Sequence, residues 1–222
     1  MSATLIGAVA TAGILGVTHA IEPDHVAGIA SLTSQYGDTR LSALVGACFS
    51  LGHVLFVVVW LGIGYLLFGR TEFPAVFDAI GTVGVGLLLA ALGFTLAFGG
   101  LRRVRCTHGH EHDHGGDRDH GVQSYLKTGV IGALFTLSPP LSMIVFSSTL
   151  LSGGPELVAV AVLAYAVGIT VTMSALGAGS GAVFGAVNGF NVRVYGIAQA
   201  VTGVLVIGMS TSLLAGVVPL PG

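Results

Sequence analysis

Residues 3–31 read ATLIGAVATAGILGVTHAIEPDHVAGIAS, an apolar run that carries a polar, ionisable segment in its second half. The run is longer than the roughly 20 residues that a helix needs to cross the hydrocarbon core of a bilayer. The segment HAIEPDH, residues 19–25, places two histidines, two carboxylates and a proline inside it. Ionisable groups are costly in a membrane and usually serve a function there. This stretch therefore predicts both a membrane-spanning helix and the position of its site.

The composition of the whole chain is that of a membrane protein. Of 222 residues, 53% are hydrophobic and only 8% are charged, and the mean hydropathy is +0.91. A soluble domain has about a quarter of its residues charged. The 35 glycines fit as well, because small residues let membrane helices pack closely. A packing ridge is predicted where glycine recurs every four residues, at Gly177, Gly181, Gly185 and Gly189. We predict a single transmembrane domain over residues 1–222.

Six apolar stretches are long enough to span a bilayer, and their continuous apolar character favours helices over a β-barrel. They lie near residues 3–31, 41–69, 76–100, 123–152, 156–183 and 193–218. Six spans can be read as three plus three, and an odd number in each half requires an inverted repeat. Pro23 interrupts the first span and Pro139–Pro140 the fourth, which is typical of helices that form a transporter's binding site. The predicted fold is an all-α polytopic membrane protein with six transmembrane helices in two inverted three-helix halves.

Lysine and arginine are distributed unevenly between the two ends of these spans. Only Arg70 lies at one end, and at the other end lie Arg40, Arg102, Arg103, Arg105, Arg118, Lys127 and Arg193. Cytoplasmic loops carry the excess of basic residues. The count therefore predicts an inner-membrane protein with both termini outside. The N-terminus lacks the positive region of a secretory signal, so the first span is expected to be retained.

The ionisable residues of the first span are candidate metal ligands. His19 and Glu22, and likewise Glu22 and His25, are three residues apart and are neighbours on a helix surface. Pro23 lacks an N–H and disrupts the helix, which can turn Asp24 inward. Imidazole and carboxylate ligands together suit Ni, Co, Zn or Fe(II) better than Cu(I), Mg or Ca. The alternative is a proton relay or a hydrogen-bonded network without metal, for which such residues are equally typical.

A further histidine, His53, lies in the apolar segment CFSLGHVLF of the second span. A lone histidine in a soluble core is usually structural, but inside a membrane an ionisable residue is a functional candidate. Ser50 is the expected polar neighbour, and Cys48 is expected to be a buried small hydrophobe. His53 is therefore added to the candidate ligands.

Residues 101–122 form a predicted cytoplasmic loop that contains THGHEHDHGGDRDH. Its histidines are His108, His110, His112, His114 and His120. Histidine-rich tracts bind divalent metals. In a glycine-rich loop this binding should be weak and exchangeable, because ordering the chain costs conformational entropy. An expression tag is the alternative reading, although tags are usually terminal and homopolymeric. We predict that the loop is a secondary site that handles metal in the cytosol.

Several other classes of function are less well matched. An intramembrane metalloprotease would carry HExxH on a membrane helix, and no predicted span contains it. A thiol–disulfide carrier would need paired cysteines, whereas Cys48 and Cys106 are expected at different depths. No GxxxxGK[ST] motif for ATP occurs, and a net charge of −2 argues against nucleic acid as a partner. A membrane metal sensor without transport remains an alternative.

In these residues the chain resembles the nickel/cobalt transporter superfamily, called NiCoT or NicO. The family signature, His-X4-Asp-His in a transmembrane helix, is matched by His19, Asp24 and His25. A second motif, Leu-Gly-His in the next helix, is matched by residues 51–53. The resemblance implies that these histidines and Asp24 take part in metal selection and passage. The His-rich loop resembles that of the six-helix branch, which includes nickel/cobalt efflux proteins and urease-accessory uptake proteins.

The sequence therefore predicts a secondary permease for Ni(II) or Co(II) that is not an enzyme and holds no prosthetic group. The transported metal is the bound substrate, and the predicted ligands are His19, Glu22, Asp24, His25 and His53. The lipid bilayer is the second partner, and a cytosolic metallochaperone is a candidate third. Uptake and efflux both fit the sequence. The alternative is a proton-coupled transporter of a small non-metal solute, with the same residues acting as a proton relay.

Overall fold

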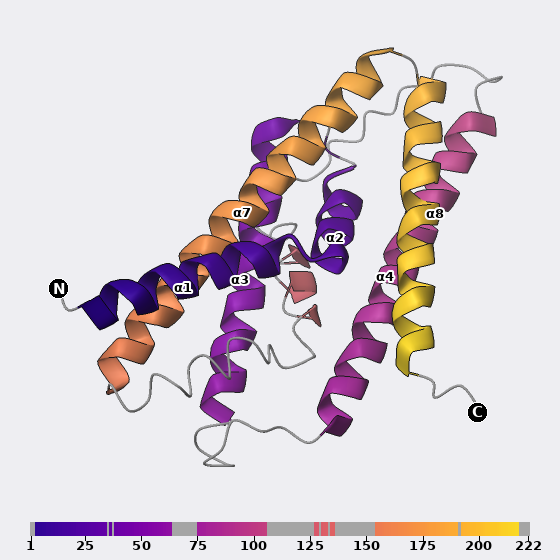
Figure 1. Ribbon diagram of the computed structural model, residues 1–222. Helices are drawn as coiled ribbons and strands as arrows, with labels where there is room; N and C mark the ends of the chain where they lie inside the picture. The colour runs from indigo at the N-terminus through magenta and orange to yellow at the C-terminus, as the bar shows by residue number, and fades with distance from the viewer. Residues whose placement is uncertain are drawn as a thin grey trace.

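The computed structural model describes residues 3–34, 36, 38–63, 75–105, 127–128, 130–132, 134–135, 154–190 and 192–217. Its main elements are the helices α1 (Ala3–Ala20), α2 (Pro23–Thr33), α3 (Thr39–Ile63), α4 (Ala75–Arg105), α7 (Pro155–Phe190) and α8 (Val192–Val217), drawn in Figure 1. Four of these helices are long and apolar enough to cross a membrane, and the bent pair α1 and α2 together would make a fifth span. The chain is therefore an all-helical polytopic membrane protein in the residues described.

The predicted spans agree with the helices to within several residues at each end. The second, third, fifth and sixth predicted spans correspond to α3, α4, α7 and α8. Helix α4 continues to Arg105, beyond the predicted end of its span, and α7 continues to Phe190. The predicted fourth span, residues 123–152, falls mostly outside the described residues. The count of six spans and the two inverted halves therefore stay predictions.

The first predicted span consists of two helices, α1 and α2, bent by 60° at the break between them. Pro23 occupies the first position of α2, where its missing N–H is not needed. The ring of a proline disfavours the helical conformation in the preceding residue. Glu22 accordingly adopts the extended angles φ −58° and ψ 142°. The interruption that the sequence predicts at Pro23 is thus a complete break of the helix.

The long helices pack as two close pairs, α3 with α7 and α4 with α8 (Figure 1). A Cβ atom at Gly46 of α3 would overlap the carbonyl oxygen of Met173 on α7. On the predicted glycine ridge of α7, a Cβ atom at Gly177 would overlap the carbonyl oxygen of Ser42 on α3, and one at Gly181 would overlap the Ser42 hydroxyl. Because glycine has no side chain there, the backbones of the two helices approach each other closely.

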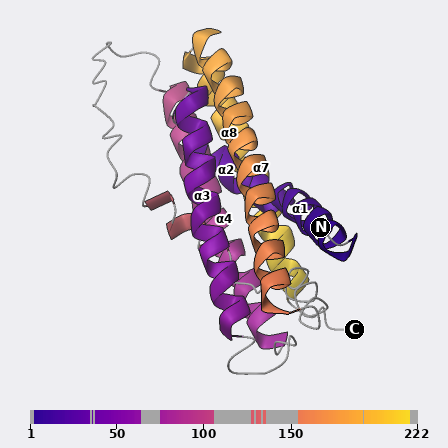
Figure 2. The same ribbon diagram turned by 90° about the vertical axis from the view of Figure 1, so that its left-hand side faces the viewer.

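Helix α2 lies between the two pairs and contacts α3, α4, α7 and α8 (Figures 1 and 2). Its far end is anchored to α8, where the hydroxyl of Tyr195 donates a hydrogen bond to the carbonyl oxygen of Ser34. Gln199 Nε2 in turn donates to the Tyr195 hydroxyl at 3.3 Å. With 11 residues, α2 is about 16 Å long, roughly half of a hydrocarbon core. Its first turn carries His25, which is buried inside the bundle.

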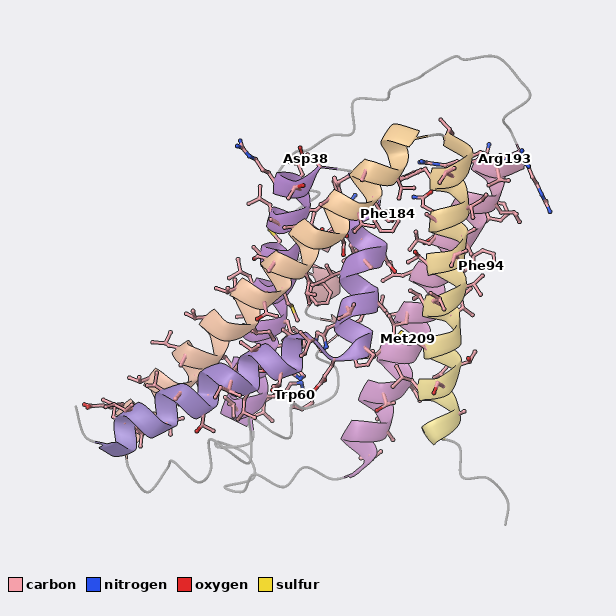
Figure 3. All side chains as sticks on the ribbon, turned by 45° about the horizontal axis from the view of Figure 1, so that its top comes forward. Asp38, Trp60, Phe94, Phe184, Arg193 and Met209 are labelled. Atoms are coloured by element: carbon pink, nitrogen blue, oxygen red, sulfur yellow. The ribbon has the colours of Figure 1, made fainter. Side chains whose placement is uncertain are left out.

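One end of the bundle holds Arg40, Arg103 and Arg193, three of the basic residues on which the predicted orientation rests. Figure 3 shows Asp38, before α3, and Arg193, at the start of α8, at the same end, with Trp60 toward the other. Asp38 Oδ1 accepts the backbone N–H of Leu41 at 2.8 Å and so caps α3. Arg103, in the last turn of α4, lies 4.9 Å from the ring centroid of Tyr195. The side of the membrane on which this end lies stays a prediction.

Candidate metal site

Three imidazole rings meet where α1 ends, α2 begins and α3 passes beside them. The ring centroid of His25 lies 4.7 Å from that of His19 and 4.8 Å from that of His53. The His19 and His53 centroids are 5.2 Å apart, and one ring nitrogen from each histidine lies within 4.8 Å of the others. On a straight helix, residues six apart point about 120° away from each other. The break at Pro23, rather than the helical repeat, therefore brings His19 and His25 together.

The ring nitrogens of this cluster divide into two sets. The Nδ1 atoms of two rings face carboxylates: His19 Nδ1 is 3.0 Å from Glu22 Oε1, and His25 Nδ1 is 3.1 Å from Asp24 Oδ1. On the other side, His19 Nε2 and His53 Nε2 are 3.1 Å apart. When an Nδ1–H donates to a carboxylate, the Nε2 atom of that ring keeps its lone pair. The lone pairs of His19 and His25 are thus available on Nε2.

The Nε2 atom of His25 is buried and has no hydrogen-bond partner in the structure. Only 2% of the surface of His25 and 1% of that of His53 are exposed. An unsatisfied buried acceptor costs about 1–3 kcal/mol, so it needs a compensating ligand or a functional reason. The opposite side is open, since 51% of the Glu22 side chain and 13% of the His19 side chain are exposed. The exposed part of the cluster is therefore on the side of Glu22.

Aromatic rings close the buried side of the cluster. The Phe49 and Phe135 ring centroids each lie 6.2 Å from that of His25 and 5.1 Å from each other. On α7, the Tyr165 ring lies 6.1 Å from the His19 ring. These rings exclude water, and electrostatic interactions are stronger in such an environment. The arrangement places the nitrogen atoms of the cluster between an aromatic wall and the exposed carboxylate of Glu22.

All five residues proposed from the sequence gather here: His19, Glu22, Asp24, His25 and His53. Glu22, Asp24 and His25 also form a second group that offers two oxygens and one nitrogen within 4.8 Å of one another. One expectation for α3 is wrong, because Cys48 is only half-buried. Ser50 pairs with Thr170 on α7, with 2.6 Å between the hydroxyl oxygens.

The structure leaves the predicted loop site untested, and it places beside the cluster three aromatic residues that no sequence motif predicted. The five loop histidines lie outside the described residues, as does the segment HEHDH, residues 110–114, whose letters fit the HExxH pattern of metalloproteases. Phe49, Phe135 and Tyr165 border the cluster, but no motif singles them out. Their positions depend on helix packing, which an apolar sequence does not specify residue by residue.

Fold and site together define a multi-pass membrane protein with a buried imidazole and carboxylate cluster. A sequence model of the NicO family, described as "High-affinity nickel-transport protein", matches residues 5–138, more than half of the chain. The chain belongs to this family, and the resemblance drawn from the two motifs is confirmed. The matched segment includes every residue of the cluster. No match was found among curated proteins or among solved structures.

Proposed function

We propose that the protein is a secondary permease for Ni(II) or Co(II) that holds the ion on Nε2 of His19, His25 and His53. Membership of the NicO family supports nickel transport. The observation that carries the assignment to these residues is the buried, unpartnered Nε2 of His25 beside two other imidazoles. Imidazole nitrogens suit both metals. The ion is the substrate, held only while it crosses.

The separation of two of the nitrogens supports this ligand set. Two nitrogens that are each about 2.1 Å from a metal, at a right angle, are about 3.0 Å apart, and at a tetrahedral angle about 3.4 Å apart. His19 Nε2 and His53 Nε2 are 3.1 Å apart, nearer to the right angle. Right-angled ligand sets are typical of Ni(II). In the empty site one of these nitrogens donates a hydrogen bond to the other. For both nitrogens to bind the metal, that hydrogen must move to the Nδ1 atom of its own ring.

The carboxylates have a supporting role in this proposal. Histidine ligands of metals usually donate their other ring N–H to a carboxylate, which fixes the ring and raises its basicity. Glu22 and Asp24 stand in this relation to His19 and His25. Glu22 is also exposed, so it is the first charged group that an entering cation meets.

The path across the membrane follows from the break in the first span. Interrupted helices place ion sites inside transporters, and rocking of the two halves gives alternating access to the site. We place the protein in the inner membrane with its termini outside, and the His-rich loop that follows α4, residues 106–122, in the cytosol. The loop histidines gather or buffer metal at that side. A cytosolic metallochaperone is the partner expected to exchange metal with the loop.

One observation favours the proton-relay alternative. Glu22, His19 and His53 form a continuous chain of contacts of 3.0 and 3.1 Å, along which a proton can pass. A transporter of a non-metal solute would use such a chain without binding metal. The test must therefore ask for metal flux directly.

The experiment is uptake into proteoliposomes that are offered Ni(II), Co(II), Zn(II) and Fe(II) under both polarities of a proton gradient. We expect saturable Ni(II) or Co(II) flux, abolished by His25→Ala. The matched control is Ser50→Ala, which removes a buried polar group of α3 that bonds to α7 and not to the cluster. Absence of flux for all four metals, with a well-folded protein, would favour the relay or a sensor.

A further inference from the structure

Tyr165 on α7 is fully buried, with 0% of its surface exposed, and its hydroxyl has no hydrogen-bond partner in the structure. A buried tyrosine normally finds a partner for its hydroxyl. The ring lies 6.1 Å from that of His19, on the α7 side of the cluster. Two buried polar atoms in this region therefore lack a partner: Nε2 of His25, which belongs to the cluster, and the hydroxyl of Tyr165, whose ring lies beside the cluster.

The position of Tyr165 is fixed by the packing of α1 on α7. A Cβ atom at Gly16 would overlap the carbonyl oxygen of Tyr165 and would lie 3.0 Å from the backbone nitrogen of Ile169. The two backbones thus touch one turn before His19, which lies in the last turn of α1. Because the contact is between backbones, the phenol is held beside the His19 ring.

A second buried tyrosine shows what a structural hydroxyl looks like in this protein. Tyr195 is 4% exposed, and its hydroxyl donates to the Ser34 carbonyl and accepts from Gln199. That hydroxyl joins α2 to α8 and is fully used. The Tyr165 hydroxyl is buried without any hydrogen bond that would offset the cost of its burial. Its partner is therefore one that the metal-free protein lacks.

We propose that Tyr165 is a further residue of the ion site and that its hydroxyl hydrogen-bonds a water molecule carried by the bound ion. The inference rests on the proposed function. Three imidazoles leave coordination positions on a transition metal that water fills. A buried water needs two to four polar partners, whereas Phe49 and Phe135 make the other wall of the cluster apolar. Tyr165 supplies one such partner, because a hydroxyl both donates and accepts.

The test compares the same substitution, tyrosine to phenylalanine, at the two buried positions. Both variants are made in the full chain with the five loop histidines changed to alanine, so that the loop does not contribute to binding. The Ni(II) dissociation constant is measured by titration calorimetry, and thermal unfolding is measured without metal. Loss of a group that supports a metal ligand weakens binding by about 10- to 100-fold, and this is the expectation for Tyr165→Phe. Its unfolding temperature without metal should stay the same or rise.

For Tyr195→Phe the expectation is reversed: unchanged Ni(II) affinity and a lower unfolding temperature, because a used hydrogen bond is lost. An unchanged Ni(II) affinity in Tyr165→Phe would overturn the inference. A lower unfolding temperature of Tyr165→Phe without metal would also overturn it, since the hydroxyl would then have a structural partner. If the role of Tyr165 is overturned in either way but His25→Ala still abolishes Ni(II) binding, the proposed function stands. If the parent protein binds neither Ni(II) nor Co(II), the role of Tyr165 and the proposed function are both contradicted.

Discussion

His19 Nε2 and His53 Nε2 lie 3.1 Å apart across the interface of α1 and α3, although the two residues are 34 positions apart in the sequence. The Nδ1 atom of His19 faces Glu22 instead. His25 repeats this division, with Nδ1 on Asp24 and a buried Nε2 that has no partner. The carboxylates thus lie beside the Nδ1 atoms of His19 and His25, and the Nε2 atom of His19 faces that of His53.

This division makes His53 as important as the histidines of the longer motif. We expect His53→Ala to abolish saturable Ni(II) flux, because it removes one of three nitrogen ligands. Ser50→Ala, one turn earlier on α3, should retain flux, since Ser50 bonds to Thr170. Flux in proteoliposomes measures both. Full activity of His53→Ala would show that His53 is a structural residue of the core.

The carboxylates should be separable from the ligands. Glu22→Gln and Asp24→Asn keep the shape of the side chain and remove the charge that orients each ring. Substitution of such partners usually weakens metal binding by about 10- to 100-fold, and we expect flux to survive at saturating metal. Calorimetric Ni(II) titration of each variant measures the effect. A loss as complete as in His25→Ala would instead identify the carboxylate as a direct ligand.

The helix break should be necessary for metal binding. Pro23→Ala restores a backbone N–H and favours a continuous helix, on which His19 and His25 would point about 120° apart. We expect weaker Ni(II) binding with an unchanged or raised unfolding temperature. Pro155→Ala is the control, because Pro155 also begins a helix, α7, but lies away from the cluster. Equal affinity of the two variants would mean that tertiary packing alone holds the break.

Much of this arrangement could be predicted from the sequence, for definite physical reasons. Apolar runs of spanning length predict the helices, and a proline inside such a run predicts the break at Pro23. Ionisable residues inside a span predict the position of the site. The predictions place His19, Glu22, Asp24 and His25 in one cluster, and the structure brings them together.

The remaining features depend on packing between helices. The angle of the break decides that Glu22 and Asp24 face Nδ1 atoms, and no local pattern specifies it. The place of Tyr165 beside His19 depends on the contact of Gly16 with α7. The pairing of the Ser50 hydroxyl with Thr170 on α7 likewise depends on how α3 packs against α7. Membrane helices are apolar on most sides, so sequence alone seldom distinguishes a face that meets lipid from one that meets a helix.

The close pair of α3 and α7 gives a prediction about stability. Gly46→Ala places a Cβ where the Met173 carbonyl oxygen lies, and overpacking of this kind costs about 1–3 kcal/mol. Gly62→Ala on the same helix meets no atom within 4 Å and should leave stability unchanged or slightly raised. Thermal unfolding in detergent compares them. Equal stability of both variants would contradict the close packing of these backbones.

The central claim, that three imidazoles hold the transported ion, is tested most directly by X-ray absorption at the nickel edge. The sample is the full chain with its five loop histidines replaced by alanine, loaded with one equivalent of Ni(II). We predict the scattering of three imidazole rings together with oxygen ligands, and of two rings in His25→Ala if that variant still retains metal. A spectrum of oxygen ligands alone, or one that His25→Ala leaves unchanged, would contradict the account.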